Sequence, residues 1–304
     1  MLEELDEAVQ FEVSMGNYGN KFDSTCKPLA SVTQFSRVVF DGCNYYFLPW
    51  IDKKPVISLS CFWEDINFRL HMLNRIIFTC DRLARKLKDL QFAMKAKLPE
   101  QQLASVWLSL VDQLIEDCSE PLVIAPDVST ITPLDLKMLK VRNQVLKNIF
   151  SAASKMRHEA TQLEETLSAI QDWLDCLKNI AEEPQNSMPD VTIWMLVGSK
   201  RVAYCRIPAY DILNGPGKAI GKHCGTTQTI FLKPLPDEKK QDNIPAQLRV
   251  RFWLGLASEE KKINEATEGK LAVFVETVKT CECASTSALH ACRNVKSYFQ
   301  LFMK

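Results

Sequence analysis

Residues 66–97 read INFRLHMLNRIIFTCDRLARKLKDLQFAMKAK, and this stretch predicts a long amphipathic helix. Apolar or small side chains recur at alternating intervals of four and three residues, which is the spacing of one buried stripe along a helix. The stripe consists of Ile66, Leu70, Leu73, Ile77, Cys80, Ala84 and Leu87. Because proline cannot continue a helix, we expect this one to end before Pro99.

The residues that follow predict further helices. A second apolar stripe runs through residues 103–114, and Thr132 and Pro133 have the residue types of an N-cap and a first helical position. The helical spacing then continues without glycine or proline from residue 134 to 183, which as one helix would extend about 75 Å. Its neighbours are too short to cover that length. We therefore expect a turn within residues 152–161 and four helices in total.

Strand-like sequence lies on both sides of the helices. The candidate strands before them are residues 11–15, 37–40 and 45–48. The candidates after them are residues 191–197, 201–207, 229–232, 248–254 and 271–276. Gly198, Ser199 and Lys200 separate the first two of the latter group, which is the pattern of a β-hairpin. The simplest fold is α+β, a four-helix bundle inserted between the strands of a β-sandwich.

Composition narrows the class of protein. The chain of 304 residues has 37 basic and 37 acidic residues, which excludes a globally basic nucleic-acid-binding protein. It has no run of about 20 apolar residues, and its acidic start is unlike a secretory signal. Eleven cysteines, an odd number found mostly inside apolar segments such as those around Cys80, Cys118 and Cys176, favour buried thiols over disulfides. We expect a cytoplasmic protein, or one on the cytosolic face of a membrane.

Charge alternates between the expected helices. Residues 62–97 contain eight basic and four acidic residues, and residues 99–120 contain no basic and five acidic residues. Residues 132–157 contain six basic residues and one acidic residue, and residues 158–183 contain one basic and seven acidic residues. In a ring of four helices each would lie beside two of opposite sign. Exposed pairs contribute only about 0–1 kcal/mol each, so the pattern specifies arrangement more than stability.

The end of the first helix is the candidate lipid-binding site. Its basic residues are Arg82, Arg85, Lys86, Lys88, Lys95 and Lys97. One interpretation is a solvated helix face. The other is docking on anionic phospholipid, to which each basic residue near the surface contributes about 1 kcal/mol. Asp81 and Asp89 subtract from that attraction, so we expect low affinity.

The sequence lacks the motifs that carry enzyme chemistry. It contains no Gly-x-Ser-x-Gly, His-Glu-x-x-His or Cys-x-x-Cys, and Pro216 replaces a glycine that a phosphate-binding loop would need. Cys281, Cys283, His290 and Cys292 have the residue types of a zinc site but a weak spacing. We therefore expect no enzyme, with no catalytic residue, metal or cofactor.

Several short stretches resemble the ferlin family. They are EVSMGNYGNKFD at 12–23, FDGCNYYFLPW at 40–50, WEDI at 63–66, EEPQNSMPD at 182–190, IWM at 193–195, KRVAY at 200–204, TQTIFLK at 227–233 and WLGL at 253–256. The resemblance covers about residues 10–276 and is closest to the myoferlin and dysferlin branch with its fer-1-like relatives. Residues 277–304 contain no tryptophan, whereas the family continues there into a tryptophan-rich region, so we expect a truncated form with a divergent tail.

The resemblance implies a domain order. Residues 1–60 would supply the first strands of a C2-like sandwich, and residues 61–183 a FerA-like four-helix bundle that associates with phospholipid. Residues 184–276 would be FerB-like strands that complete the sandwich, and residues 277–304 the divergent tail.

The resemblance also implies a function. Ferlins act in calcium-dependent membrane fusion and plasma-membrane repair, and the full-length proteins are anchored by a C-terminal transmembrane helix that this chain lacks. The implied partners are anionic phospholipid membranes and proteins of the fusion or repair machinery, with no nucleic acid. Calcium belongs to the full-length family, and no site for it is evident in this chain. The alternative is a non-enzymatic protein-interaction scaffold without direct lipid binding.

Overall fold

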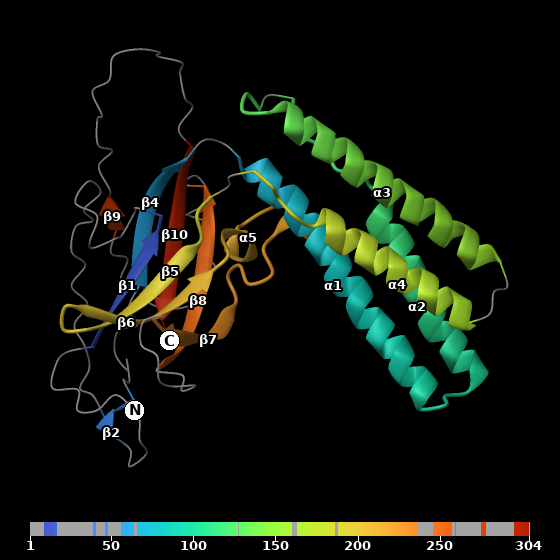
Figure 1. The fold of residues 1–304 in the computed structure, drawn as a ribbon, viewed down its shortest axis with the longest axis horizontal. Coiled ribbons are helices and arrows are strands. Elements are labelled where there is room, and N and C mark those ends of the chain that lie inside the picture. Colours follow the sequence, from blue (N-terminus) through green and yellow to red (C-terminus); the bar gives the residue numbers. More distant parts are fainter. Residues whose placement is uncertain are drawn as a thin grey trace. The chain divides into compact units, whose positions relative to one another are not determined.

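The computed structural model describes residues 9–16, 39–40, 46–47, 56–63, 66–126, 128–159, 163–185, 188–235, 246–256, 259, 275–277 and 295–303. The chain divides into two compact units (Figure 1). The helical unit comprises Ile66–Ser187 and Pro216–Ala219, and the β unit comprises Met1–Asp65, Met188–Gly215 and Ile220–Lys304. The fold class is therefore α+β, as the sequence predicts.

Four long helices make up most of the helical unit. They are α1 (Asn67–Lys95), α2 (Glu100–Ser119), α3 (Pro133–His158) and α4 (Leu163–Ile180). The expected break in the third helical stretch therefore begins after His158. Helix α1 packs against α2 and α4, and α3 packs against the same two helices. Each helix thus lies beside two of opposite net charge, which confirms the arrangement that the charge pattern predicts.

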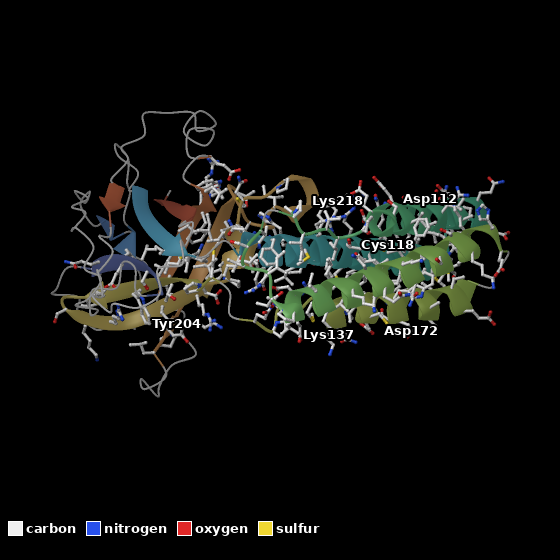
Figure 2. All side chains as sticks on the ribbon, turned by 90° about the horizontal axis from the view of Figure 1, so that it is seen from above. Asp112, Cys118, Lys137, Asp172, Tyr204 and Lys218 are labelled. Carbon is white, nitrogen blue, oxygen red and sulfur yellow. The ribbon has the colours of Figure 1, made fainter. Side chains whose placement is uncertain are left out.

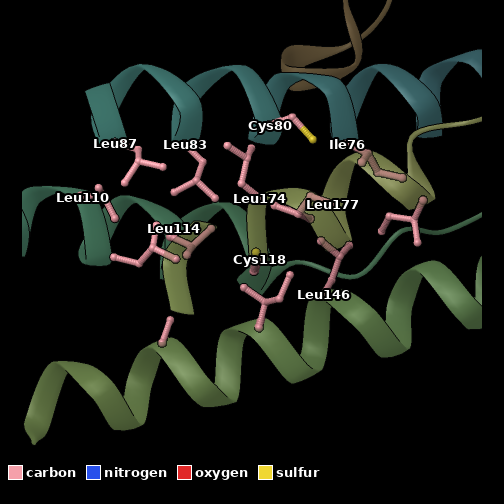
Figure 3. Close-up of a cluster of buried hydrophobic side chains, with 14 of the residues drawn as sticks. Ile76, Cys80, Leu83, Leu87, Leu110, Leu114, Cys118, Leu146, Leu174 and Leu177 are labelled. Atoms are coloured by element: carbon pink, nitrogen blue, oxygen red, sulfur yellow. The ribbon is translucent and has the colours of Figure 1, made fainter. Parts of the chain in front are cut away.

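One apolar core joins all four helices (Figure 3). Its most deeply buried members include Leu90 of α1, Leu110 of α2 and Leu177 of α4. The buried stripe of α1 differs from the prediction, because Ile76 is buried whereas Ile77 is only half-buried. The same shift occurs one heptad later, where Leu83 is buried and Ala84, which also packs against the core, is only half-buried. Because α1 contacts two neighbouring helices, its buried face is wider than a single stripe.

Two of the cysteines belong to this core. Cys80 and Cys118 are buried, and burial raises the pKa of their thiols to about 11 and about 12 respectively. Both therefore stay protonated and unreactive at neutral pH. Cys176, which the sequence predicts to be buried, is exposed, so that expectation was wrong.

The β unit is built on one sheet of eight strands in the order β1-β5-β6-β7-β8-β10-β4-β9. The strands are β1 (Val9–Met15), β4 (Val56–Trp63), β5 (Val191–Val197), β6 (Lys200–Ile207), β7 (Thr227–Pro234), β8 (Ala246–Leu256), β9 (Val275–Thr277) and β10 (Val295–Met303). Only the β4–β9 pairing is parallel among these described strands. A separate pair consists of β2 (Val39–Phe40) and β3 (Tyr46–Phe47), and helix α5 (Ala209–Ile212) follows β6.

Sequence patterning located most of these strands. The predicted hairpin is present as β5 and β6, and Gly198 at its turn has φ 59°, a conformation that favours glycine. Strand β4 was missed, because the last strand predicted before the helices is residues 45–48. Strand β10 was missed because it lies in the predicted divergent tail, yet it pairs with both β4 and β8.

A buried carboxylate holds together the end of the helical unit where the chain enters and leaves it. Asp135 is 1% exposed and forms a capping box with Thr132 at the start of α3. Arg69, at the start of α1, donates from Nε and Nη2 to its two carboxylate oxygens, both at 2.9 Å. Gln185, which follows α4, donates from Nε2 to the same carboxylate. Asp135 therefore links the first turn of α1, the first turn of α3 and the segment after α4.

Two further polar residues of α3 extend this network. The guanidinium of Arg142, which is fully buried, donates to the carbonyl oxygens of Ile180 at 3.3 Å and Glu182 at 2.6 Å. These bonds satisfy carbonyl groups at the end of α4 that have no partner within the helix. Asn143 exchanges hydrogen bonds with the backbone of Leu122, which precedes α3. The polar residues of α3 thus fix the ends of the other helices.

Replacing Asp135 with asparagine should destabilise the helical unit by about 3–5 kcal/mol, because it leaves the Arg69 charge buried without a counter-ion. Urea unfolding followed by far-ultraviolet circular dichroism measures this. Asp175→Asn is the matched control, since Asp175 pairs with Lys178 on the exposed face of α4. Equal effects of the two substitutions would contradict the structural role of Asp135.

The same carboxylate makes stability depend on pH. Burial acts to raise the pKa of Asp135, but the hydrogen bonds from Arg69, Thr132 and Gln185 outweigh it and hold the pKa below its usual value. Its stabilisation is therefore complete above the unfolded pKa of about 4 and is lost as the pH falls through the lower folded pKa. The Asp135→Asn variant should lose less stability than the parent protein on acidification.

Candidate lipid-binding surface

The six basic residues predicted to bind lipid are not equivalent. Arg82 is only partly exposed, and its Nη1 donates to Oδ1 of Asp117 at 2.9 Å. The carboxylate of Asp117 is 2% exposed, and the guanidinium of Arg82 also lies over the ring of Phe78 at 5.0 Å. A buried carboxylate needs a cation, so Arg82 contributes to the packing of α1 on α2.

Asp117 has a second cationic partner from a distant part of the sequence. Lys218 lies in the short 3-10 helix η1 (Gly217–Ala219), which belongs to the helical unit (Figure 2). Its Nζ donates to Oδ1 of Asp117 at 3.0 Å, and Nδ2 of Asn74 donates to the carbonyl of Ala219 at 3.1 Å. The segment Pro216–Ala219 is therefore bonded to both α1 and α2. From the sequence, this stretch was recognised only as a loop that departs from the phosphate-binding pattern at Pro216.

Arg85 and Lys86 are partly engaged within the helices. Nε of Arg85 donates to the carbonyl of Asp81 one turn earlier, and the side chain is exposed. Nζ of Lys86 donates to Oγ of Ser109 at 2.9 Å, which bridges α1 and α2. Arg85 therefore keeps an accessible charge, whereas Lys86 is held against α2.

Lys88, Lys95 and Lys97 are exposed and form no ion pair with any residue that the structure describes. They lie on the last two turns of α1 and on the turn that leads into α2. Helix α3 ends and α4 begins at the same end of the helical unit (Figure 1). We call Lys88, Lys95 and Lys97 together with Arg85 the basic tip.

The backbone at the basic tip has an unusual lysine. Helix α1 ends in a Schellman motif, in which the N–H of Lys97 donates to the carbonyl of Met94 at 3.0 Å and the N–H of Leu98 to that of Ala93 at 3.2 Å. Lys97 occupies the left-handed position of this motif with φ 52°, where glycine is the usual residue. Left-handed backbone costs a lysine roughly 1–2 kcal/mol. Lysine therefore stands at a position where glycine, which has no Cβ atom, would be more stable.

An exposed aromatic side chain accompanies the basic tip. Phe92 is 74% exposed, the largest fraction among the large apolar side chains in the described ranges. It lies four residues after Lys88 and three before Lys95, so the three share one face of α1. Phe92 was not among the predicted site residues, although an aromatic side chain opposite the buried stripe of a helix is a signal that the sequence carries.

A second exposed basic surface lies on α3. Lys137, Lys140 and Lys147 are exposed on the side of α3 away from the core, and Figure 2 shows Lys137 pointing outward. Helix α3 is the alternative site for any contact with anionic lipid.

Other sequence predictions concern metals and membrane spans. Within the described residues, no group of three or more His, Cys, Asp or Glu side chains is placed to hold a metal ion. Cys281, Cys283, His290 and Cys292 lie outside the described residues. None of the helices in the described part of the chain is both long and apolar enough to cross a bilayer.

Two family models of known protein domains match parts of this chain. The family model of the FerA (NUC095) domain matches residues 93–157, and that of the FerB (NUC096) domain matches residues 184–255. Asp117 thus lies in the FerA match and its partner Lys218 in the FerB match.

Sequence identity to longer proteins assigns the chain to the same family. Over 278 residues, or 91% of this chain, the sequence is 51% identical to myoferlin of Xenopus tropicalis. It is 49% identical over the same length to the myoferlins of Homo sapiens and Mus musculus. The chain belongs to the ferlin family and spans 14% of the length of these relatives.

The contacts of Arg82 and Lys88 predict that only substitution of Arg82 destabilises the helical unit. Arg82→Gln should lower the free energy of unfolding by about 1–3 kcal/mol, because Asp117 loses a charge-assisted hydrogen bond. Lys88→Gln should leave the free energy of unfolding unchanged. Urea titrations of the two variants test this, and destabilisation by Lys88→Gln alone would show that the roles were assigned wrongly.

Proposed function

We propose that the helical unit is a membrane-associating module that docks on anionic phospholipid through the basic tip. The observation that carries this proposal is the group of exposed lysines, Lys88, Lys95 and Lys97, at one end of the unit without ion-pair partners among the described residues. Unpaired cations at one end of a helical body give a directional attraction to a negative surface.

The distribution of the other polar groups supports the choice of this end. The buried ionic contacts of Asp135 and Arg142 lie where the chain enters and leaves the helical unit. That end is occupied by internal hydrogen bonds. The basic tip, in contrast, carries a lysine in left-handed backbone at a cost in stability, and such strain is typical of functional sites.

The expected affinity is low. Each basic residue near an anionic surface contributes about 1 kcal/mol, and Asp89 offsets part of this attraction. At physiological ionic strength the Debye length is about 8 Å, so only residues held close to the surface count. Binding by charge alone should therefore be weak and strongly sensitive to salt.

We further propose the arrangement that the family resemblance implies. The helical unit would be a FerA-like four-helix bundle, with the boundaries 61–183, inserted between the strands of a C2-like sandwich formed by residues 1–60 and 184–276. Support comes from the FerA and FerB matches and from the pairing of β1, which precedes the helices, with β5, which follows them. An inserted domain requires its two ends to lie together, and the shared contacts of Arg69 and Gln185 with Asp135 supply this.

On this basis the chain would act as a non-enzymatic part of a ferlin in calcium-dependent membrane fusion and plasma-membrane repair. It would be cytoplasmic and peripheral on the cytosolic face of membranes, and it would work with other proteins of the fusion or repair machinery. Support comes from about 50% identity to myoferlins. The alternative is a protein-interaction scaffold that does not touch lipid.

Liposome sedimentation with charge-reversal variants tests the proposal. Lys88→Glu, Lys95→Glu and Lys97→Glu combined should abolish sedimentation with phosphatidylserine-containing vesicles. The matched control reverses the same number of exposed charges on α3, by Lys137→Glu, Lys140→Glu and Lys147→Glu, and should sediment like the parent protein. Loss of binding only in the α3 variant would move the contact to α3. No sedimentation of the parent protein at low salt would favour the scaffold.

A further inference from the structure

Phe92 lies on the exposed face of α1, three residues before the end of the helix. Its side chain is 74% exposed, whereas Leu90 and Ala93 beside it in sequence are buried in the helical unit. Arg85, Lys88 and Lys95 lie seven and four residues before it and three after it, so basic side chains flank the ring along the helix.

The end of α1 adds a second apolar group. Leu98 is 38% exposed, and its N–H donates to the carbonyl of Ala93, which fixes it at the same end of the helix as Phe92. Lys97 precedes it in left-handed backbone. Two apolar side chains thus stand among cations where the chain turns into α2.

We propose that Phe92 is a membrane-insertion anchor, with its ring entering the boundary between headgroups and acyl chains of an anionic bilayer while Lys88 and Lys95 contact lipid phosphates. The inference rests on the proposed function and adds an apolar contact to it. An apolar side chain surrounded by lysines is the pattern of helices that lie in the membrane interface. Lysine stems extend along apolar material while their ammonium groups reach the headgroups.

A lipid bilayer fits this surface better than a protein partner. The charges next to the ring are mostly of one sign, and Asp89 is the exception on this face. Anionic lipid supplies both a dense negative charge and an apolar layer directly beneath it, which matches lysines and an aromatic ring side by side.

Insertion predicts a component of binding that salt does not remove. Screening weakens the attraction between lysines and headgroups, whereas burial of an aromatic ring is not weakened by moderate salt. The parent protein should therefore retain measurable sedimentation with vesicles of phosphatidylserine and phosphatidylcholine after the salt concentration is raised.

Phe92→Ser should remove this component and reduce the partition constant at high salt about tenfold or more, while low-salt binding persists. Phe231→Ser is the matched control, because Phe231 is also an exposed phenylalanine, 48% exposed on β7. Identical binding of Phe92→Ser and the parent protein at every salt concentration would overturn the anchor.

Depth measurements test insertion directly and do not depend on affinity. Phe92→Trp and Phe231→Trp each add one tryptophan to the six already present. Vesicles with brominated acyl chains should quench the added fluorescence of Phe92→Trp and leave that of Phe231→Trp unchanged. Equal quenching of the two variants would overturn the anchor.

The outcomes separate this inference from the proposed function. If the parent protein sediments with anionic vesicles at low salt but Phe92→Trp is not quenched, docking by charge stands and insertion is wrong. If the parent protein does not sediment at any salt concentration, both are wrong.

Discussion

The carboxylate of Asp135 is the constraint on which the helical unit depends. A carboxylate that is 1% exposed must be fully partnered, and its partners come from the start of α1, the cap of α3 and the segment after α4. These contacts require the chain to enter and leave the unit at one place. Because the two ends of the helical unit are adjacent, a strand before the unit can pair with a strand after it in one sheet, as β1 and β5 do.

The two ends of the helical unit therefore differ in whether their polar side chains are buried and paired or exposed. At one end, buried ionic and hydrogen-bonded contacts of α3 satisfy the ends of its neighbours. At the other end, lysines and Phe92 remain exposed, and Lys97 adopts a left-handed backbone that a glycine would adopt more easily. Between them, one apolar core joins the four helices, and each helix lies beside two of opposite net charge.

Local patterns in the sequence were sufficient for the helices, the β5–β6 hairpin and the cap at Thr132, because helix period, turn residues and caps depend on neighbouring residues. Contacts between distant residues were not predictable. In the sequence, nothing distinguishes Arg82 from the other five basic residues, and only the structure shows that it pairs with Asp117. Lys218 donates to the same carboxylate from a position about 100 residues later in the sequence. The shift of the α1 stripe from Ile77 to Ile76 likewise depends on which two helices flank α1.

Hydrogen–deuterium exchange of the whole chain, with and without anionic vesicles, tests whether one end of the helical unit binds lipid while the other is closed by the buried network. Without vesicles, the amide of Asp135, which donates to Oγ1 of Thr132 in a buried capping box, should exchange more slowly than the amides of the exposed basic tip. Vesicles should slow exchange in peptides covering residues 88–100 and leave those around Asp135 unchanged. Slowed exchange around Asp135 or along the exposed face of α3, with none near Phe92, would show that the basic tip is not the lipid-binding end.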